Sequence, residues 1–237
     1  MSTPPLPDSR WALFLDLDGT LLDFAPTPDA VVVPDDLVAT LSNLAGKLER
    51  ALAIVSGRRL DDIDRFMAPL VLPCGAEHGA IMRYTAGEAG QDTLPPTPDD
   101  WLARAGEAVT ALPGTLLEHK THGLVLHYRR APKAEEALKR IAESFVAESR
   151  GVFELLTSNM AWEIRPRGIS KGRVVERFME HPPFEGRVPV FIGDDITDRD
   201  GCAAARKLGG HGLMVPEVFP AGPPAVRAWL AGLTTQL

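Results

Sequence analysis

The sequence predicts an α/β protein in which a doubly wound parallel-sheet core carries an inserted α+β domain. Near both ends of the chain, short apolar runs alternate with segments of helical spacing, as in parallel sheets covered by helices. In the middle of the chain, strand-like segments come in adjacent pairs separated by short turns, as in antiparallel sheets. The change of pattern indicates two domains.

The first part of the chain predicts strands over 11–16 and 51–57 and helices over 34–49 and 58–67. Both strand segments are nearly continuous apolar runs, which is typical of strands that are buried on two faces. In the segment 34–49, apolar residues recur at intervals of three and four, the spacing of an amphipathic helix. The expected order is therefore strand, helix, strand, helix.

The last part of the chain repeats this alternation. It predicts a helix over 168–180, a strand over 188–195, a helix over 197–208 and a short strand over 212–215. We expect these strands to join those of the first part in one parallel sheet, because strands that alternate with helices form such sheets.

The middle of the chain is bounded by two candidate hinges, a Gly- and Pro-rich linker at 87–100 and the segment RPRG at 165–168. Between them the pattern predicts helices near 99–112 and 132–149 and strands over 115–120, 123–129, 152–158 and 160–166. We therefore assign 1–96 and 167–237 to the core and 97–166 to the inserted domain.

Composition excludes several classes of protein. The 237-residue chain has a formal net charge of −7, which disfavours a mainly electrostatic nucleic-acid binder. Cys74 and Cys202 show no metal-binding or redox spacing, as expected in a reducing compartment. The first ten residues carry no signal-peptide pattern and no later run approaches a membrane span. These features predict a cytoplasmic protein without a membrane partner; a monomer is compatible with the sequence, which does not fix the oligomeric state.

Carboxylates follow two of the predicted core strands. Asp16 and Asp18 end the first strand, and Asp194 ends the strand over 188–195. Because ligands of doubly wound sheets bind beyond the carboxyl ends of the strands, we expect these groups to converge. A cluster of oxygen ligands without His or Cys suits Mg²⁺. Ser56 and Lys171 are placed to hold the phosphate oxygens that commonly complete a magnesium site.

Four motifs carry a resemblance to a known family. They are DLDGT at 16–20, SGR at 56–58, SKG at 170–172 and GDDITDRD at 193–200. In this order they resemble the four motifs of the haloacid dehalogenase superfamily of aspartyl-phosphate phosphatases. The inserted α+β domain is similar to the larger cap class of that superfamily. The resemblance therefore implies a haloacid dehalogenase-like core with a cap.

Further segments resemble the trehalose-6-phosphate phosphatases within that superfamily. They are GAEHGA at 75–80, LEHKTHGLVLHYR at 117–129 and WEIRPRGISKG at 162–172. The chain departs from that family at two points: Arg199 follows Asp198 where an acidic residue is common, and Asn159 stands at a cap position that is often basic. The resemblance implies Mg²⁺-dependent hydrolysis of trehalose 6-phosphate, a small-molecule sugar phosphate.

The resemblance also implies roles for the strand-end residues. Asp16 would be the nucleophile, and Asp18 would transfer protons while its backbone carbonyl binds the metal. Asp194 would complete the protein ligands of Mg²⁺. Lys171 would act with these residues on the phosphate.

Neighbouring residues would support that machinery. Asp195 and Asp198 would orient metal-bound waters and neighbouring groups. Thr20 would orient Asp18, and Gly19 would let backbone N–H groups approach the phosphate, as would the loop carrying Gly57.

The inserted domain is expected to have one polar sheet face. Residues two apart in a strand share a face, so Glu118 and Lys120 lie together, as do Glu163 and Arg165. The polar face would bind the sugar hydroxyls, through residues that also include Arg129 and Asn159. The alternative is that this face only meets water.

The sequence does not fix the role of Arg58 or the identity of the substrate. Arg58 is either a substrate contact or the partner of a structural ion pair. The core motifs do not determine which sugar is bound. The substrate is therefore trehalose 6-phosphate or another ester, such as sucrose, mannosylglycerate or glucosylglycerol phosphate. A different class is a non-catalytic sugar-phosphate sensor, or a partner domain of a glycosyltransferase.

Overall fold

The computed structural model describes residues 3–25, 30–86 and 94–237. The chain forms two compact units. The core unit comprises Met1–Gln91 and Ser170–Leu237, and the cap unit comprises Asp92–Ile169. The linker predicted at 87–100 lies partly outside the described residues.

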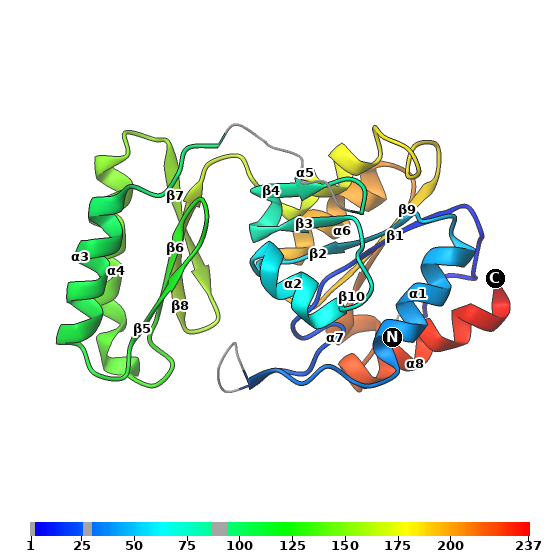
Figure 1. Cartoon of the computed structure of the whole chain (residues 1–237), viewed down its shortest axis with the longest axis horizontal. Helices are drawn as coiled ribbons and strands as arrows, with labels where there is room; N and C mark the ends of the chain where they lie inside the picture. Colours follow the sequence, from blue (N-terminus) through cyan, green and yellow to red (C-terminus); the bar gives the residue numbers. More distant parts are fainter. Residues whose placement is uncertain (1–2, 26–29, 87–93) are drawn as a thin grey trace. The chain divides into compact units, whose positions relative to one another are not determined.

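The core unit contains a six-stranded sheet (Figure 1). Its strands, in spatial order, are β10 (His211–Met214), β9 (Val188–Gly193), β1 (Trp11–Leu15), β2 (Leu52–Val55), β3 (Cys74–Ala76) and β4 (Ile81–Arg83). All neighbours pair in parallel except β4, which runs antiparallel to β3. Leu15 pairs with both Ile54 and Ile192, so the carboxyl ends of β1, β2 and β9 are level. This register places the residues that follow these strands at one edge of the sheet.

Helices cover both faces of the core sheet. Leu13 and Leu15 of β1 belong to a buried apolar cluster with residues of α1 (Leu37–Lys47), α2 (Leu60–Met67) and α8 (Pro223–Gln236). Phe14, on the other face, belongs to a second cluster with residues of α5 (Lys171–Phe178) and α6 (Asp198–Lys207). Side chains that alternate between two buried faces explain why β1 is apolar throughout.

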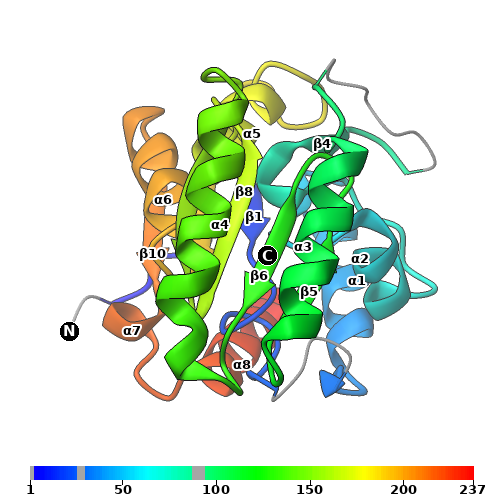
Figure 2. The ribbon, with the colours of Figure 1, turned by 90° about the vertical axis from the view of Figure 1, so that its left-hand side faces the viewer.

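The cap unit is a two-layer α+β structure. Its antiparallel sheet has the order β5 (Leu116–His119), β6 (Leu124–His127), β8 (Ala161–Pro166) and β7 (Phe153–Ser158). The helices α3 (Asp99–Ala111) and α4 (Glu135–Glu148) cover one face (Figure 2). Leu126, Trp162 and Ile164 pack into a buried cluster with residues of both helices. The apolar face therefore lies where the two-residue period of the strands predicts it.

Several elements have no counterpart in the sequence predictions. They are β3, β4, the 3₁₀ turn Glu77–Gly79, and the C-terminal helices α7 (Val215–Val218) and α8. The two strands have three residues each, which is too short for a period to show. Among the helices of the described residues, none is long and apolar enough to cross a membrane.

Candidate active site

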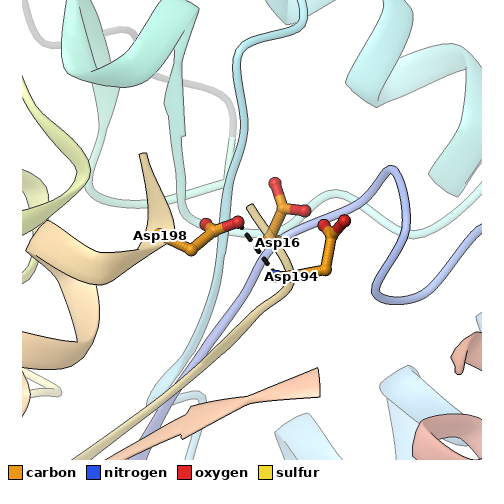
Figure 3. Close-up of side chains that lie close together, drawn as sticks. All are labelled: Asp16, Asp194 and Asp198. Carbon is orange, nitrogen blue, oxygen red and sulfur yellow. Dashed lines mark hydrogen bonds between the residues drawn. The ribbon is translucent and has the colours of Figure 1, made fainter. Parts of the chain in front are cut away.

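Three carboxylates meet at the level edge of the core sheet. Asp16 directly follows β1, Asp194 directly follows β9, and Asp198 is the first residue of α6. One carboxylate oxygen from each lies within 4.8 Å of the others, and Figure 3 shows the side chains close together. Positions that are far apart in sequence thus converge on one acidic cluster, as the strand order requires.

Lys171 places its ammonium group between two of these carboxylates. Its Nζ atom donates to Oδ1 of Asp16 and to Oδ1 of Asp198, at 2.7 Å in each case. The lysine is the first residue of α5, and Ser170 caps the helix by accepting from the backbone N–H of Arg173. Burial lowers the pKa of Lys171, but the charges of the two carboxylates outweigh burial and raise it. Lys171 is therefore a buried, permanently charged ammonium.

Asp198 is held by contacts to both of its oxygens. While Oδ1 accepts from Lys171, Oδ2 accepts from the backbone N–H groups of Asp194 and Asp195, at 3.1 Å each. Figure 3 shows the contact with Asp194. Gly193 makes room for this arrangement, because a Cβ atom there would lie 2.2 Å from Cγ of Asp198. Asp198 therefore fixes the loop after β9.

The carboxylate of Asp195 binds residues at the end of the loop between β9 and α6. Its Oδ1 accepts from the backbone N–H and the hydroxyl of Thr197 and from the backbone N–H of Asp198. These contacts satisfy N–H groups at the start of α6, as a capping residue does. The contacts in the structure give Asp195 a part in holding the helix start.

The cluster carries more negative charge than Lys171 neutralises. Burial raises the pKa of Asp194 to about 7, and the charges of Asp198 and Asp195 add to the rise. Burial also raises the pKa of Asp16 and of Asp198 against the opposing charge of Lys171. One ammonium group cannot neutralise several buried carboxylates, so the site favours a further cation.

The residues after Asp16 shape the approach to Asp194. Gly19 has φ of +80°, and a Cβ atom there would lie 2.3 Å from Oδ2 of Asp194. The expectation that Thr20 orients Asp18 is wrong: its hydroxyl donates instead to Oδ1 of Asp194, at 3.4 Å. The tight turn after β1, in which the N–H of Thr20 donates to the carbonyl of Leu17, directs the threonine toward β9.

Asp18 has a different partner, and its contacts identify Arg58 as the partner of an ion pair. Nε of Arg58 donates to Oδ2 of Asp18 at 2.6 Å, and Nη2 donates to Oδ1 at 2.7 Å. The guanidinium also lies over the ring of Phe66, with Cζ 4.8 Å from the ring centroid. Arg58 thus binds the Asp18 carboxylate through two neighbouring N–H groups on one edge of its guanidinium.

The loop after β2 is closely packed around Ser56. This residue is buried, and its hydroxyl accepts from the backbone N–H of Arg58 at 3.2 Å. A Cβ atom on Gly57 would lie 2.5 Å from Nε2 of His78, so glycine allows the histidine ring to approach. His78 itself is buried.

The cap unit gathers charged residues on the sheet face opposite its helices. Glu118 accepts from Nζ of Lys120 at 2.6 Å and pairs with Nε2 of His127 at 2.7 Å. Glu118 and Glu163 both pair in register with Val125 of β6, so they flank it in one row. Burial raises the pKa of Glu118, but the His127 hydrogen bond and the Lys120 charge outweigh it, and the pKa is lowered to about 2.

Two expected cap contacts lie away from this row. Arg129 and Asn159 are both exposed, and Nη2 of Arg129 donates to the backbone carbonyl of Asn159 at 3.4 Å. Arg129 is four residues beyond Val125 along the chain, so the pair stands further along the sheet. His127 is the cap residue on the polar face to which the sequence analysis assigned no role. Its position indicated its face, because His127 is two residues from Val125 and residues two apart in a strand lie on the same face.

Comparison with solved structures assigns the fold to a known class. The chain resembles a solved haloacid dehalogenase-like hydrolase from Bacteroides thetaiotaomicron, with a TM-score of 0.57, 14% identity and coverage of 81% of this chain and 84% of that one. It also resembles the C-terminal domain of C. albicans trehalose-6-phosphate phosphatase, with a TM-score of 0.75, 21% identity and coverage of 97% and 94%. The fold is haloacid dehalogenase-like.

Sequence comparison narrows this class to one family. The family described as trehalose-phosphatase matches residues 14–224. The trehalose-6-phosphate phosphatase of Escherichia coli (strain K12) is 38% identical over 242 aligned residues, which cover 99% of this chain and 90% of that protein. The chain belongs to the trehalose-phosphatase family.

Proposed function

We propose that this protein hydrolyses trehalose 6-phosphate to trehalose and phosphate, through a covalent phosphoryl group on Asp16. The observation that carries the proposal is the buried contact of Asp16 with Lys171 at 2.7 Å, next to a cluster of carboxylates. A sequence relative with 38% identity over nearly the whole chain is named for this activity.

Mg²⁺ fits the donors of the cluster. All of them are carboxylate oxygens, which Mg²⁺ prefers. Both oxygens of Asp198 are already engaged, so Asp16 and Asp194 are the side chains that would hold the ion, with the backbone carbonyl of Asp18. When bound, the ion would screen the repulsion between the carboxylates and a phosphate.

In the first step, a carboxylate oxygen of Asp16 bonds to phosphorus as the bond from phosphorus to the sugar oxygen breaks. The leaving oxygen takes the electron pair of that bond and a proton from Asp18, which gives the sugar hydroxyl. Lys171 orients Asp16 and offers positive charge to the transferring group. The product of this step is an aspartyl phosphate.

In the second step, water returns Asp16 to its starting state. Asp18, now a carboxylate, takes a proton from water while the water oxygen bonds to phosphorus and the bond to Asp16 breaks. Inorganic phosphate leaves, and Asp18 again carries the proton for the next cycle. Atoms and charges balance over the two steps.

The cap unit would recognise the sugar. Glu118, Lys120 and Glu163 belong to one polar face, and fixed donors and acceptors of this kind suit a ligand with many hydroxyl groups. The engagement of Glu118 by both Lys120 and His127 would hold its carboxylate in one orientation. Recognition would then lie on the cap and chemistry on the core.

Phosphate release from a panel of esters tests the proposal. The panel holds the 6-phosphates of trehalose, glucose and sucrose with mannosylglycerate and glucosylglycerol phosphates, each with Mg²⁺ and with EDTA. We expect the highest kcat/KM for trehalose 6-phosphate and no turnover after chelation. A higher value for another ester would reassign the substrate. Turnover of none, with binding retained, would favour the non-catalytic sensor.

A further inference from the structure

We propose that Arg58 is the positioning residue for proton transfer by Asp18. The inference rests on the proposed function and deepens it, because it assigns a task at the same site to a residue that touches neither the acidic cluster nor Lys171 in the contacts described. Arg58 would hold the Asp18 carboxyl group at the angle from which it reaches the leaving oxygen.

The geometry is that of a rigid support. Arg58 contacts both oxygens of Asp18, at 2.6 and 2.7 Å. The arginine side chain is 13% exposed and that of Asp18 is 29% exposed, so the pair is partly shielded while Asp18 stays reachable from solvent. A surface pair held only by flexible side chains would position little.

Arg58 is itself held from two sides. Its guanidinium lies over Phe66 of α2, and its backbone N–H donates to the hydroxyl of Ser56. Attraction to the face of an aromatic ring favours one position of a guanidinium. The loop after β2 and the helix α2 therefore fix the orientation of a carboxylate that follows β1.

Two contacts allow a transfer that one contact does not. Before the transfer, the Asp18 oxygen that carries the proton directs it at the leaving sugar oxygen, while the other oxygen accepts from Arg58. Once the proton has left, both oxygens of the carboxylate accept from the guanidinium, as they do in the structure. The carboxyl group then stays in place during the transfer. A lysine would offer a point charge without this two-point hold, so arginine is the residue type that the task requires.

The test compares leaving groups. A sugar alkoxide needs a proton to leave, whereas a nitrophenolate leaves without one. We use kcat/KM because it reports the steps through aspartyl-phosphate formation and leaves out the hydrolysis that both substrates share. Arg58→Ala should lower kcat/KM for trehalose 6-phosphate by about 100-fold, within the range that general acids contribute, and for 4-nitrophenyl phosphate by less than about 5-fold. Arg58→Lys should fold and fall between the wild type and Arg58→Ala.

Arg65→Ala is the matched control. Arg65 also lies over Phe66, at 5.1 Å, and pairs with an aspartate, Asp62, at 2.7 Å, but no described contact joins it to Asp18. We expect both substrates to keep their kcat/KM within about twofold in this variant, as for most surface changes.

Four outcomes would overturn the inference. Equal losses of kcat/KM on both substrates would mean that Arg58 supports the fold only, and no loss on either would mean that it has no part. In Arg58→Ala/Asp18→Asn, a loss beyond that of Asp18→Asn alone would show that the two residues act separately. If the wild type prefers another sugar phosphate, that ester replaces trehalose 6-phosphate and the comparison stands. A wild type that hydrolyses no phosphate ester would contradict the proposed function itself and, with it, this role for Arg58.

Discussion

Nζ of Lys171 lies 2.7 Å from Oδ1 of Asp16, and both side chains are buried, with 3% and 5% of their surface exposed. A second carboxylate, Asp198, accepts from the same ammonium group. Since isolated charges are costly in a protein interior, this lysine is expected to stabilise the core unit as well as to act on phosphate.

Lys171→Met should therefore destabilise the protein by about 3–5 kcal/mol, the usual cost of leaving a buried charge without its partner. Chemical denaturation followed by circular dichroism measures the free energy of unfolding. The control is Lys207→Met, which removes an exposed lysine that pairs with Glu176 at 3.0 Å and should cost less than about 1 kcal/mol. Equal effects in the two variants would contradict the account of Lys171.

Gly193→Ala should displace Asp198, because the added Cβ atom would lie 2.2 Å from its Cγ. The backbone N–H groups of Asp194 and Asp195 would then lose their acceptor. A buried polar group left unsatisfied lowers the free energy of unfolding by about 1–3 kcal/mol. Gly46→Ala is the control, because no atom lies within 4 Å of the added Cβ in α1. That substitution should stabilise the helix by about 0.5–1 kcal/mol. Thermal unfolding of both variants checks the contrast.

The stability of the metal-free protein should fall as pH rises. The pKa of Asp194 is raised from 3.8 to about 7 in the folded state. Between these pH values the unfolded chain releases a proton that the folded chain keeps. Rising pH therefore favours the unfolded state, and the free energy of unfolding declines until about pH 7. We expect the increase of Tm on adding Mg²⁺ to be small near about pH 5 and largest above about pH 7.

The Asp194→Asn variant separates this effect from general ion binding. It removes the carboxylate whose pKa is raised, so the metal-free variant should be more stable than the metal-free wild type above about pH 7. It should also lose the response of Tm to Mg²⁺. Scanning calorimetry with EDTA and with Mg²⁺ at several pH values provides both readouts. An unchanged Mg²⁺ response would remove Asp194 from the metal site.

His127→Ala should weaken sugar recognition and spare the chemistry. Without the His127 contact at 2.7 Å, Glu118 keeps only Lys120 among its described contacts and is less firmly oriented. We expect kcat/KM for trehalose 6-phosphate to fall, with a loss of transition-state stabilisation of about 1–3 kcal/mol. The kcat/KM for 4-nitrophenyl phosphate should stay nearly unchanged. Lys120→Ala and Glu163→Ala should show the same selectivity.

Arg140→Ala is the control for the cap variants. Arg140 lies on α4, is 72% exposed and pairs with Glu136 at 4.0 Å. Since the helices cover the other face of the cap sheet, its removal should change neither substrate. Losses on both substrates in His127→Ala would point to damage to the cap fold. No loss in any of the three cap variants would indicate that the polar face only meets water.

The strand ends could be predicted because periodicity and register act together. An apolar strand that stops at Asp16 and another that stops near Asp194 must bring these residues to one edge if the strands are parallel neighbours. The structure pairs the two strands directly, with Leu15 opposite Ile192. The polar and apolar faces of the cap sheet followed from the same period.

Partners within the site could not be predicted in the same way. Thr20 bonds Asp194 and not Asp18 because a turn after β1, which has no period, sets its direction. Arg58 had two candidate roles since a guanidinium serves either a carboxylate or a phosphate equally well. The contact between His127 and Glu118 depends on strand pairing between β5 and β6, which sequence spacing alone does not specify.

The central claim is that Asp16 is the nucleophile, and the turnover of Asp16→Asn on trehalose 6-phosphate tests it most directly. The amide keeps the shape of the side chain but loses the charge that attack requires. We predict a fold that is intact by circular dichroism and a kcat lowered at least about a thousandfold, equivalent to about 4 kcal/mol of barrier. A folded Asp16→Asn protein that retains about a tenth of the wild-type kcat would contradict the claim, because a tenfold loss is only about 1.4 kcal/mol.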